Sequence, residues 1–317
     1  MKNSFYEIAV MTAKKNAGAA GVQLALIDNF TMSAPILHNM PFQKASHSHH
    51  HVYARLLDAQ GLKIVDFDGR LPEAGSSYQL EEVKLTPFGA IFPIPEDLAI
   101  QAAGSPEGYL NTQVPPAMRK TGMDLEKSLY CDNFLKTARD YGTAMSATAN
   151  PVQTETFDTM VAIDWQPGEM TGLVSPLPYG AGSSFGQLFE TKWLNNKQRH
   201  KLENGVIGYA ATVKIFIGIL LANKRKISAL VNIKAIPTPK QLATLVETAE
   251  GTGNTRIYCT PGLKTAIAAE YAHSQKGHGF IGVSSAGEVS VLGVPIVTSH
   301  NIPPKFQFID APPVGVQ

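Results

Sequence analysis

Three short motifs have the residue types of a catalytic or binding site. Gly182-Ser183-Ser184-Phe185-Gly186 matches the pattern that presents a nucleophilic serine, here Ser184, on a tight turn between a strand and a helix. The preceding segment, Ser175 to Gly180, contains two prolines and no apolar strand that could deliver the serine. A loop is therefore favoured over a catalytic turn, and an α/β hydrolase that uses Ser184 is kept as an alternative.

The second motif, Gly277-His278-Gly279-Phe280-Ile281-Gly282, has the glycine spacing of a dinucleotide-binding turn. In such sites the glycines follow a strand and open a helix, whose N–H groups meet the pyrophosphate. Here the pattern predicts a helix before the glycines and a loop after them, so the order is reversed. The chain also lacks a Gly-Lys dipeptide and therefore a P-loop. We expect no cofactor.

The third motif is a run of histidines at positions 47, 49, 50 and 51. Alternation along a strand would place His47, His49 and His51 on one face, where they could bind zinc or nickel weakly. Zinc sites usually draw their ligands from separate elements with supporting partners. A polar strand face at a subunit contact is therefore favoured, and protonation near pH ~6 would then alter stability.

Other polar clusters and the cysteines predict no chemistry. Lys224-Arg225-Lys226 is the densest basic cluster, and we interpret it as a solvated turn between strands, with DNA contact as the alternative. Glu81-Glu82 is predicted to be solvated and not an acid/base pair. Cys131 and Cys259 are too few for a zinc site or a disulfide framework, so we expect buried or half-buried thiols.

The composition is that of a globular protein. The chain has 317 residues, of which 44% are hydrophobic and 17% charged, so more than one packing unit is expected. The formal net charge of +1 gives no overall attraction to nucleic acid. Residues 1–10 lack the pattern of a signal peptide. The apolar run Val206 to Ala222 is short for a membrane span and contains Lys214, so a buried strand is predicted.

The N-terminal half predicts extended parts with little core. Val22, Leu26 and Phe30 share one helical face, and the small, polar stretch before them is predicted to be an arm. Residues 47–57 and 78–85 predict two strands that are joined by a polar, turn-rich segment. Such a ribbon is unstable alone, so we expect it to lie across a neighbouring molecule.

The rest of the chain predicts mixed α/β structure. An amphipathic helix is expected after Pro115 and Pro116, running to about residue 133, with one apolar face (Met118, Gly122, Leu125 and Leu129). Strands are predicted over residues 226–236, 255–259 and 289–298. In the first of these, Ser228, Asn232 and Lys234 would face away from the apolar side. Helices are predicted to open at Thr238-Pro239, with a capping box, and at Thr260-Pro261.

Five segments, in this order over roughly 260 residues, resemble the Hong Kong 97-type major capsid proteins of tailed bacteriophages. More narrowly, the chain resembles a podovirus-type major capsid family of similar length. The segments are Ile36 to Phe42, Leu71 to Gly75, Leu125 to Asp132, Gly205 to Ile233, and Leu292-Gly293-Val294-Pro295-Ile296-Val297. The chain departs from the family where Cys131 stands in place of a glycine, in its histidine-rich strand and in the loop from Gly180 to Phe185.

The resemblance implies an α+β Hong Kong 97-type capsid fold. Residues 1–44 would form the N-terminal arm and helix, and residues 45–90 the extended β-hairpin called the E-loop. Residues 91–145 would form the peripheral domain with its spine helix. Residues 146–317 would form mainly the axial domain, with strands that return to the peripheral domain.

The same resemblance implies a structural protein and not an enzyme. Copies of the chain would assemble as hexamers and pentamers into an icosahedral head that encloses double-stranded DNA, in the cytoplasm of the host bacterium. Further partners would be portal and scaffolding proteins, an optional decoration protein and non-specifically contacted DNA, with no membrane. An encapsulin-like nanocompartment is the alternative within this fold. Candidate contacts between subunits are Asp66, Asp68, Arg70, Arg119 and Lys120.

Overall fold

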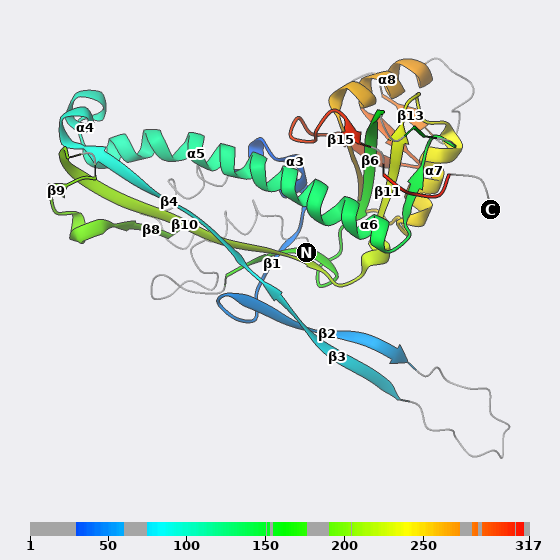
Figure 1. The fold of residues 1–317 in the computed structure, drawn as a ribbon, viewed down its shortest axis with the longest axis horizontal. Coiled ribbons are helices and arrows are strands. Elements are labelled where there is room, and N and C mark those ends of the chain that lie inside the picture. Colours follow the sequence, from blue (N-terminus) through cyan, green and yellow to red (C-terminus); the bar gives the residue numbers. More distant parts are fainter. Residues whose placement is uncertain are drawn as a thin grey trace.

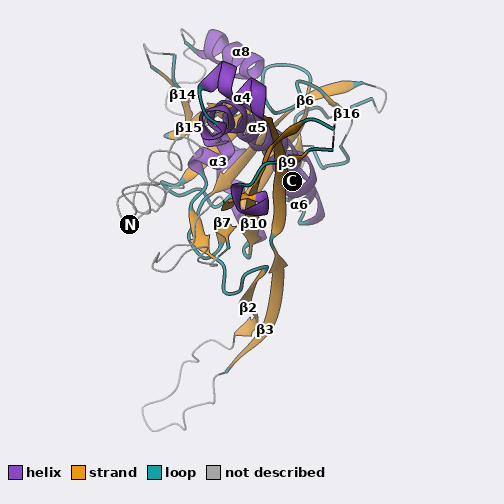
Figure 2. Ribbon diagram, turned by 90° about the vertical axis from the view of Figure 1, so that its left-hand side faces the viewer, coloured by secondary structure: helices purple, strands orange, loops and turns teal. Residues whose placement is uncertain are grey.

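The structure is a computed structural model that describes residues 30–59, 75–149, 151–152, 155–175, 190–203, 205–272, 281–284, 287–307 and 309–313. Figure 1 shows an elongated body in which one long helix lies along two long strands. A mixed α/β body stands at one end of this helix. A two-stranded ribbon projects below the long strands, on the side away from the helix. Figure 2, turned by 90°, shows the same ribbon extending away from the rest of the chain.

The long helix is α5 (Pro106–Ser128), which continues through a π-helical segment, η1 (Leu129–Leu135), into α6 (Lys136–Asp140). The predicted start after Pro115 and Pro116 is wrong, because both prolines lie inside α5. Each proline removes a helical hydrogen bond. Packing of the apolar stripe offsets this loss. The stripe continues toward the N-terminus at intervals of four residues, through buried Val114 and Leu110.

The start of α5 is fixed locally. The side chain of Ser105 accepts a hydrogen bond from the N–H of Gly108, and Pro106 occupies the first turn, where no N–H is needed. The short helix α4 (Glu96–Ala103) precedes it and ends at Gly104 with a positive φ of 68°. The proline that marks the first turn of α5 is therefore Pro106, which precedes Pro115 and Pro116 in the sequence.

The long strands belong to a six-stranded sheet in the order β1-β7-β10-β4, with β8 and β9 also paired to β10. Strand β10 covers the apolar run that was predicted to be a buried strand, and Lys214 within it is exposed. Its alternate residues Ala211, Val213 and Ile215 share one core with α5. The strands are β1 (Phe42–Lys44), β4 (Thr86–Pro95), β7 (Met170–Val174), β8 (Glu190–Trp193), β9 (His200–Lys201) and β10 (Ile207–Leu221).

The α/β body contains an eight-stranded sheet in the order β13-β14-β15-β12-β6-β11-β5, with β16 paired to β6. Helices α7 (Pro239–Thr248) and α8 (Pro261–Tyr271) pack on it. Short 3-10 turns, η2 (Leu194–Lys197) and η3 (Lys224–Lys226), connect strands. The strands are β5 (Ala144–Ser146), β6 (Thr156–Asp164), β11 (Ile227–Ile233), β12 (Thr255–Cys259), β13 (Ile281–Val283), β14 (Val289–Val291), β15 (Val294–Thr298) and β16 (Phe306–Gln307).

Local sequence signals in this body are confirmed, with one correction. Thr238 and Gln241 form the predicted capping box of α7, and the Thr260 side chain caps α8. Ile227, Ala229 and Val231 share one core as predicted, and Ser228 faces the other way, toward α7. That second face of β11 is also buried, and of the predicted polar residues only Lys234, just after the strand, is exposed. Ser228 donates to the carbonyl of Leu245, and Asn232 donates to Ser146, so these polar side chains are satisfied inside the core.

The ribbon consists of β2 (His50–Ala59) and β3 (Ser76–Lys84), paired antiparallel with one register shift between Leu56 and Asp58. Strand β3 is separated from β4 by Leu85 alone, so the ribbon joins the six-stranded sheet directly. At this joint, the Leu85 N–H donates to the carbonyl of His49. Within the described residues, no helix is both long and apolar enough to span a membrane.

The N-terminal segment, including α3 (Pro35–Asn39), packs against α5 at Gly122. A Cβ atom at this glycine would overlap the carbonyl oxygen of Phe30. We therefore expect Gly122→Ala to lower the free energy of unfolding by about 1–3 kcal/mol, as overpacking does. Gly262→Ala is the matched control, because a Cβ atom added there would meet no other atom within 4 Å. Equal midpoints of urea unfolding for the two variants would contradict this close approach.

Candidate assembly surfaces

The ribbon has two unlike faces, which follow from strand alternation. On one of them, Leu80 of β3 lies opposite Ala54 of β2. Tyr78, two residues before Leu80 in the same strand, lies on the same face. The side chains of Leu80 and Tyr78 are 74% and 62% exposed. We call Ala54, Tyr78 and Leu80 the outer face of the ribbon. Exposed apolar side chains on a thin ribbon make this face a candidate contact surface.

The inner face of the ribbon carries a polar network. The Tyr53 hydroxyl donates to Glu81 at 2.5 Å, and Arg55 pairs with the other Glu81 oxygen at 2.9 Å. The hydrogen bonds from Tyr53 and Arg55 lower the pKa of Glu81. Burial, followed by the hydrogen bond to Glu81, raises the pKa of Tyr53 to about 12. The predicted solvation of the Glu81-Glu82 pair is confirmed for Glu82, which is exposed, whereas Glu81 is partly buried in this network.

This network reaches the end of the long helix. Arg55 donates to the Tyr141 hydroxyl at 3.3 Å, and Tyr141 directly follows α6. The Lys224 ammonium lies 5.4 Å from the centre of the same Tyr141 ring, a cation–π distance. The base of the ribbon is therefore held against the body on one side, and the outer face stays exposed.

The histidines lie at the base of the ribbon but do not form the predicted face. Strand β2 begins at His50, so residues 46–49 form bends and the alternation fails. The rings of His47 and His50 stack with centroids 4.3 Å apart, whereas His49 packs against Phe216. His51 lies beside Tyr53. Across the described part of the chain, no group of three or more His, Cys, Asp or Glu side chains could hold a metal ion.

Acidification from pH ~7 to ~5 is expected to loosen the base of the ribbon. Burial, and then the charge of His47, lower the pKa of His51 below its usual value of 6.5. The folded state thus favours neutral His51, whose Nδ1 accepts from the Ser46 N–H at 3.0 Å. This contribution is complete above the unfolded pKa and is lost as the pH falls from there through the folded pKa.

Hydrogen exchange of the Ser46 amide measures this effect. We expect its protection factor to fall as the pH drops below the unfolded pKa of His51, and His51→Gln to remove most of that dependence. His49→Gln is the control, because its ring lies at the same bend but accepts no hydrogen bond from Ser46. A protection factor that is the same at both pH values would contradict the account.

The charged contact candidates are only partly described. Arg119 and Lys120 are exposed on α5, on the side away from buried Met118. Lys120 pairs with Asp124 at 2.6 Å, one turn along the helix. Asp66, Asp68 and Arg70 lie outside the described residues, as does Ser184. The role of Arg119 and Lys120 in contacts between subunits remains a prediction.

Sequence reasoning missed a buried ion pair in the α/β body. Lys226 lies 3.1 Å from Asp164, whose side chain is 0% exposed. Burial opposes the charge on Lys226, but the hydrogen bond and charge of Asp164 prevail and raise its pKa. Thr255 also donates to Asp164, at 3.1 Å. The interpretation of residues 224–226 as a solvated turn is therefore wrong for Lys226, which is buried beside Asp164 at the end of β6.

A second buried carboxylate, Glu126 of α5, also escaped sequence reasoning. It accepts from the Ile36 N–H at 3.0 Å and from the side chain of Asn301. Burial raises its pKa, and the hydrogen bonds from Asn301, Ile36 and Ser299 oppose this rise. Glu126 thus fastens both the N-terminal segment and the loop after β15 to the long helix. The isolated acidic residue within the apolar stripe was the signal in the sequence.

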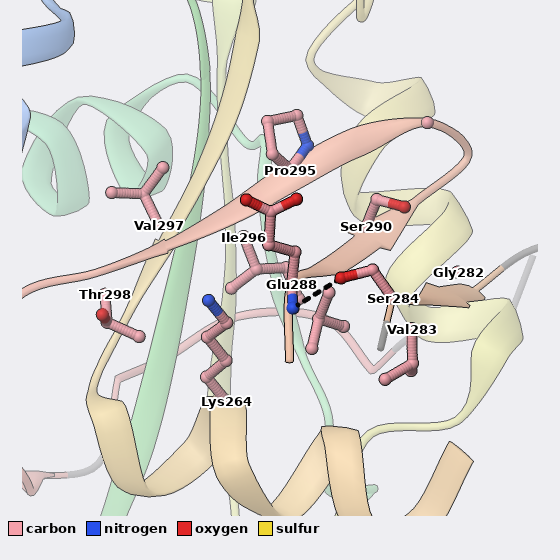
Figure 3. A pocket seen from close by; sticks show the side chains of 12 residues that line it. Lys264, Gly282, Val283, Ser284, Glu288, Ser290, Pro295, Ile296, Val297 and Thr298 are labelled. Atoms are coloured by element: carbon pink, nitrogen blue, oxygen red, sulfur yellow. Dashed lines mark hydrogen bonds between the residues drawn. The ribbon is translucent and has the colours of Figure 1, made fainter. Parts of the chain in front are cut away.

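The α/β body also contains a pocket of about 790 Å³ between α8 and the strands β13, β14 and β15. Figure 3 shows Lys264, which rises from α8, and Glu288 among the lining side chains, together with Val283 and Ile296. The Ser284 hydroxyl accepts from the Glu288 N–H at 3.1 Å and closes the turn between two strands. Among the described residues that line it, Glu288 and Lys264 are ionisable, and there is no His, Cys or Asp.

Two solved phage structures are similar in fold to this chain. No protein-family model matches the chain, and no curated protein matches it in sequence. A chain in the structure of bacteriophage Epsilon15 is 13% identical, with a TM-score of 0.53 over 81% of this chain and 84% of that one. A chain of the bacteriophage JBD30 capsid is 8% identical, with a TM-score of 0.54 over 85% and 91%. The chain has the Hong Kong 97-type capsid fold.

The expected α+β capsid fold is thereby confirmed. A chain of the holo-SrpI encapsulin complex from Synechococcus elongatus PCC 7942 is 10% identical, with a TM-score of 0.41 over 61% of this chain and 85% of that one. Because all these identities are low, the likeness to the capsid structures concerns the fold alone.

Proposed function

We propose that the chain is the major capsid protein of a tailed bacteriophage. In this role, copies of it assemble as hexamers and pentamers into an icosahedral head around double-stranded DNA. The observation that carries the proposal is the capsid fold, matched over more than four fifths of the chain by phage structures. Shell building is also consistent with a formal net charge of +1, since copies with little net charge repel one another weakly.

The ribbon supplies a specific contact for this function. Its outer face exposes Leu80 and Tyr78, while its inner face is tied to the body through Arg55 and Tyr141. We infer that the outer face lies on an adjacent copy. Such a contact is heterologous, because the ribbon of one copy meets a different surface of the next, and contacts of this kind close into rings. Each can be weak, since many of them act together in a closed shell.

The proposed domains are those that the resemblance implies. Residues 1–44 form the N-terminal arm and helix, and residues 45–90 form the E-loop that contains β2 and β3. Residues 91–145 form the peripheral domain, with α5 as its spine helix, and residues 146–317 form mainly the axial domain. The proposed setting is a head assembled in the bacterial cytoplasm, with portal and scaffolding proteins as partners. A decoration protein would be optional.

The proposed role is structural and not enzymatic. The pocket in Figure 3 contains serine, lysine and glutamate side chains, but its described lining has no histidine or aspartate that could complete a Ser-His-Asp triad. The hydrolase alternative depends on Ser184. Loss of a measured hydrolytic activity in Ser184→Ala would favour that alternative, and retained activity would remove Ser184 from it.

Nuclease treatment of purified particles tests the genome-enclosing function. A phage head protects double-stranded DNA of uniform length inside it, whereas an encapsulin-like shell holds protein cargo. We expect particles from infected cells to contain nuclease-protected DNA, released when the shell is denatured. Particles that contain protein cargo and no protected DNA would favour the nanocompartment.

A further inference from the structure

The outer edge of the six-stranded sheet is formed by β4, an edge strand with unusual composition. Among the described strands, β4 pairs with β10 alone, along its whole length. It contains no charged residue, and Ile91 at its centre is 62% exposed. Edge strands are normally protected by charges, since free N–H and C=O groups invite another strand. Here the only protective feature is proline, at positions 87, 93 and 95.

The prolines reveal which backbone groups face outward. Hydrogen-bonded and non-hydrogen-bonded pairs alternate along an antiparallel ladder. Pro87 and Pro93 have no N–H, so within the unbroken register with β10 they occupy non-hydrogen-bonded positions. Gly89 and Ile91 lie an even number of residues from both prolines, so they also occupy non-hydrogen-bonded positions of this ladder. Their N–H and C=O groups therefore point away from β10, to the free edge.

The segment between the prolines is nearly symmetric about Ala90. It reads Pro87-Phe88-Gly89-Ala90-Ile91-Phe92-Pro93, with proline at both ends and phenylalanine next to each. If two copies pair antiparallel about Ala90, Gly89 of one lies opposite Ile91 of the other. These two residues would donate one N–H···O=C hydrogen bond to each other in both directions. The two-fold axis repeats this Gly89–Ile91 pair on the other side of Ala90. The bulky Ile91 side chain then meets a residue without a side chain.

We propose that the β4 edges of two copies of this chain pair antiparallel across a two-fold axis at Ala90, so that two six-stranded sheets form one continuous sheet. The inference rests on the proposed self-assembly and names one of its contacts. Because the segment is uncharged, two identical edges approach without repulsion. Phe88 lies opposite Phe92 of the second copy, an aromatic cross-strand pair. The contact is isologous and thus complements the heterologous contact of the ribbon.

The alternative explanation is that the prolines only prevent strand addition. Prolines on an edge strand are a common protection against aggregation. That explanation accounts for Pro87 and Pro93. It gives no function to the exposed Ile91 side chain or to the outward backbone N–H groups of Gly89 and Ile91, which lie between the two prolines. The two explanations predict opposite results for a cross-link at the proposed axis.

A disulfide at position 90 tests the pairing. Two Ala90 residues would face each other in a non-hydrogen-bonded pair, with Cα atoms about 4.5 Å apart, which is within disulfide range. In assembled, full-length Ala90→Cys protein, we expect most chains to migrate as dimers on a non-reducing gel and as monomers after reduction. The unmodified protein, with its own Cys131 and Cys259, shows the background. Ile100→Cys, at a 59% exposed position on α4, is the control and should stay monomeric.

A second variant separates pairing from mere proximity. Proline at position 91 fits the ladder with β10 as Pro93 does, but it removes one outward donor from each copy. We expect Ala90→Cys with Ile91→Pro to lower the dimer yield several-fold without a change in circular dichroism. Particles in which Ala90→Cys stays monomeric would overturn the pairing and leave the shell function intact. Dimers from a protein that never forms particles would support the pairing and contradict the shell function.

Discussion

Replacing Asp164 by alanine is expected to lower the free energy of unfolding by about 3–5 kcal/mol, which is the cost of leaving a buried charge without its partner. Asp164 is fully buried and holds Lys226 at 3.1 Å, and it also accepts hydrogen bonds from Thr252 and Thr255. Its loss leaves the Lys226 ammonium, whose side chain is 10% exposed, with the more distant Glu250 at 3.6 Å as its remaining ion-pair partner. Urea unfolding of the dissociated protein measures the change.

An exposed ion pair provides the matched control for Asp164→Ala. Asp124 pairs with Lys120 at 2.6 Å, but the two side chains are 59% and 70% exposed. Asp124→Ala should therefore cost less than about 0.5 kcal/mol, as exposed helix pairs do. Combining Asp164→Leu with Lys226→Met should recover much of the stability, because no charge is left buried. An Asp164→Ala protein as stable as Asp124→Ala would contradict the buried pair.

Replacing Leu80 by aspartate is expected to abolish shell formation and leave the isolated subunit folded. Covering a leucine side chain contributes about 1.5–3 kcal/mol, and covering a carboxylate is strongly unfavourable. Since every 1.4 kcal/mol changes an equilibrium about tenfold and each copy carries the same contact, the loss is multiplied over the lattice. Leu80 is 74% exposed, so the fold itself loses little. Sedimentation velocity measures the assembled fraction.

Gln79→Asp is the control for Leu80→Asp. Gln79 is the preceding residue of β3, is exposed and lies on the opposite face of the ribbon, across from Arg55. The same new charge there should leave assembly within a few-fold of the unmodified protein. Equal loss of assembly in both variants would mean that the ribbon responds to charge alone, and normal assembly of Leu80→Asp would exclude the outer face as a contact.

The parts of the fold that local sequence governs were predictable. The capping box at Thr238 and the cap at Thr260 place α7 and α8 correctly, because they depend on residues within one turn. The apolar run that forms β10 was also recognised. The start of α5 was not, because a local penalty at Pro115 and Pro116 is outweighed by packing of Leu110 and Val114 on a distant sheet.

The polar contacts could not be predicted, because they join residues far apart in the sequence. Lys226 meets Asp164, and Glu126 meets Ile36 and Asn301, only when three chain segments converge. The prediction of a histidine face was wrong for a related reason. Strand β2 starts only at His50, where its pairing with Lys84 begins. Sequence periodicity gives no information on where such pairing stops.

Electron microscopy of the purified full-length protein tests the central claim most directly. The account predicts closed icosahedral particles of uniform diameter, in which the β2–β3 ribbon of each copy lies across an adjacent copy with Leu80 and Tyr78 covered. A protein that remains a stable monomer over a wide range of salt and pH, or particles in which the ribbon projects freely into solvent, would contradict it.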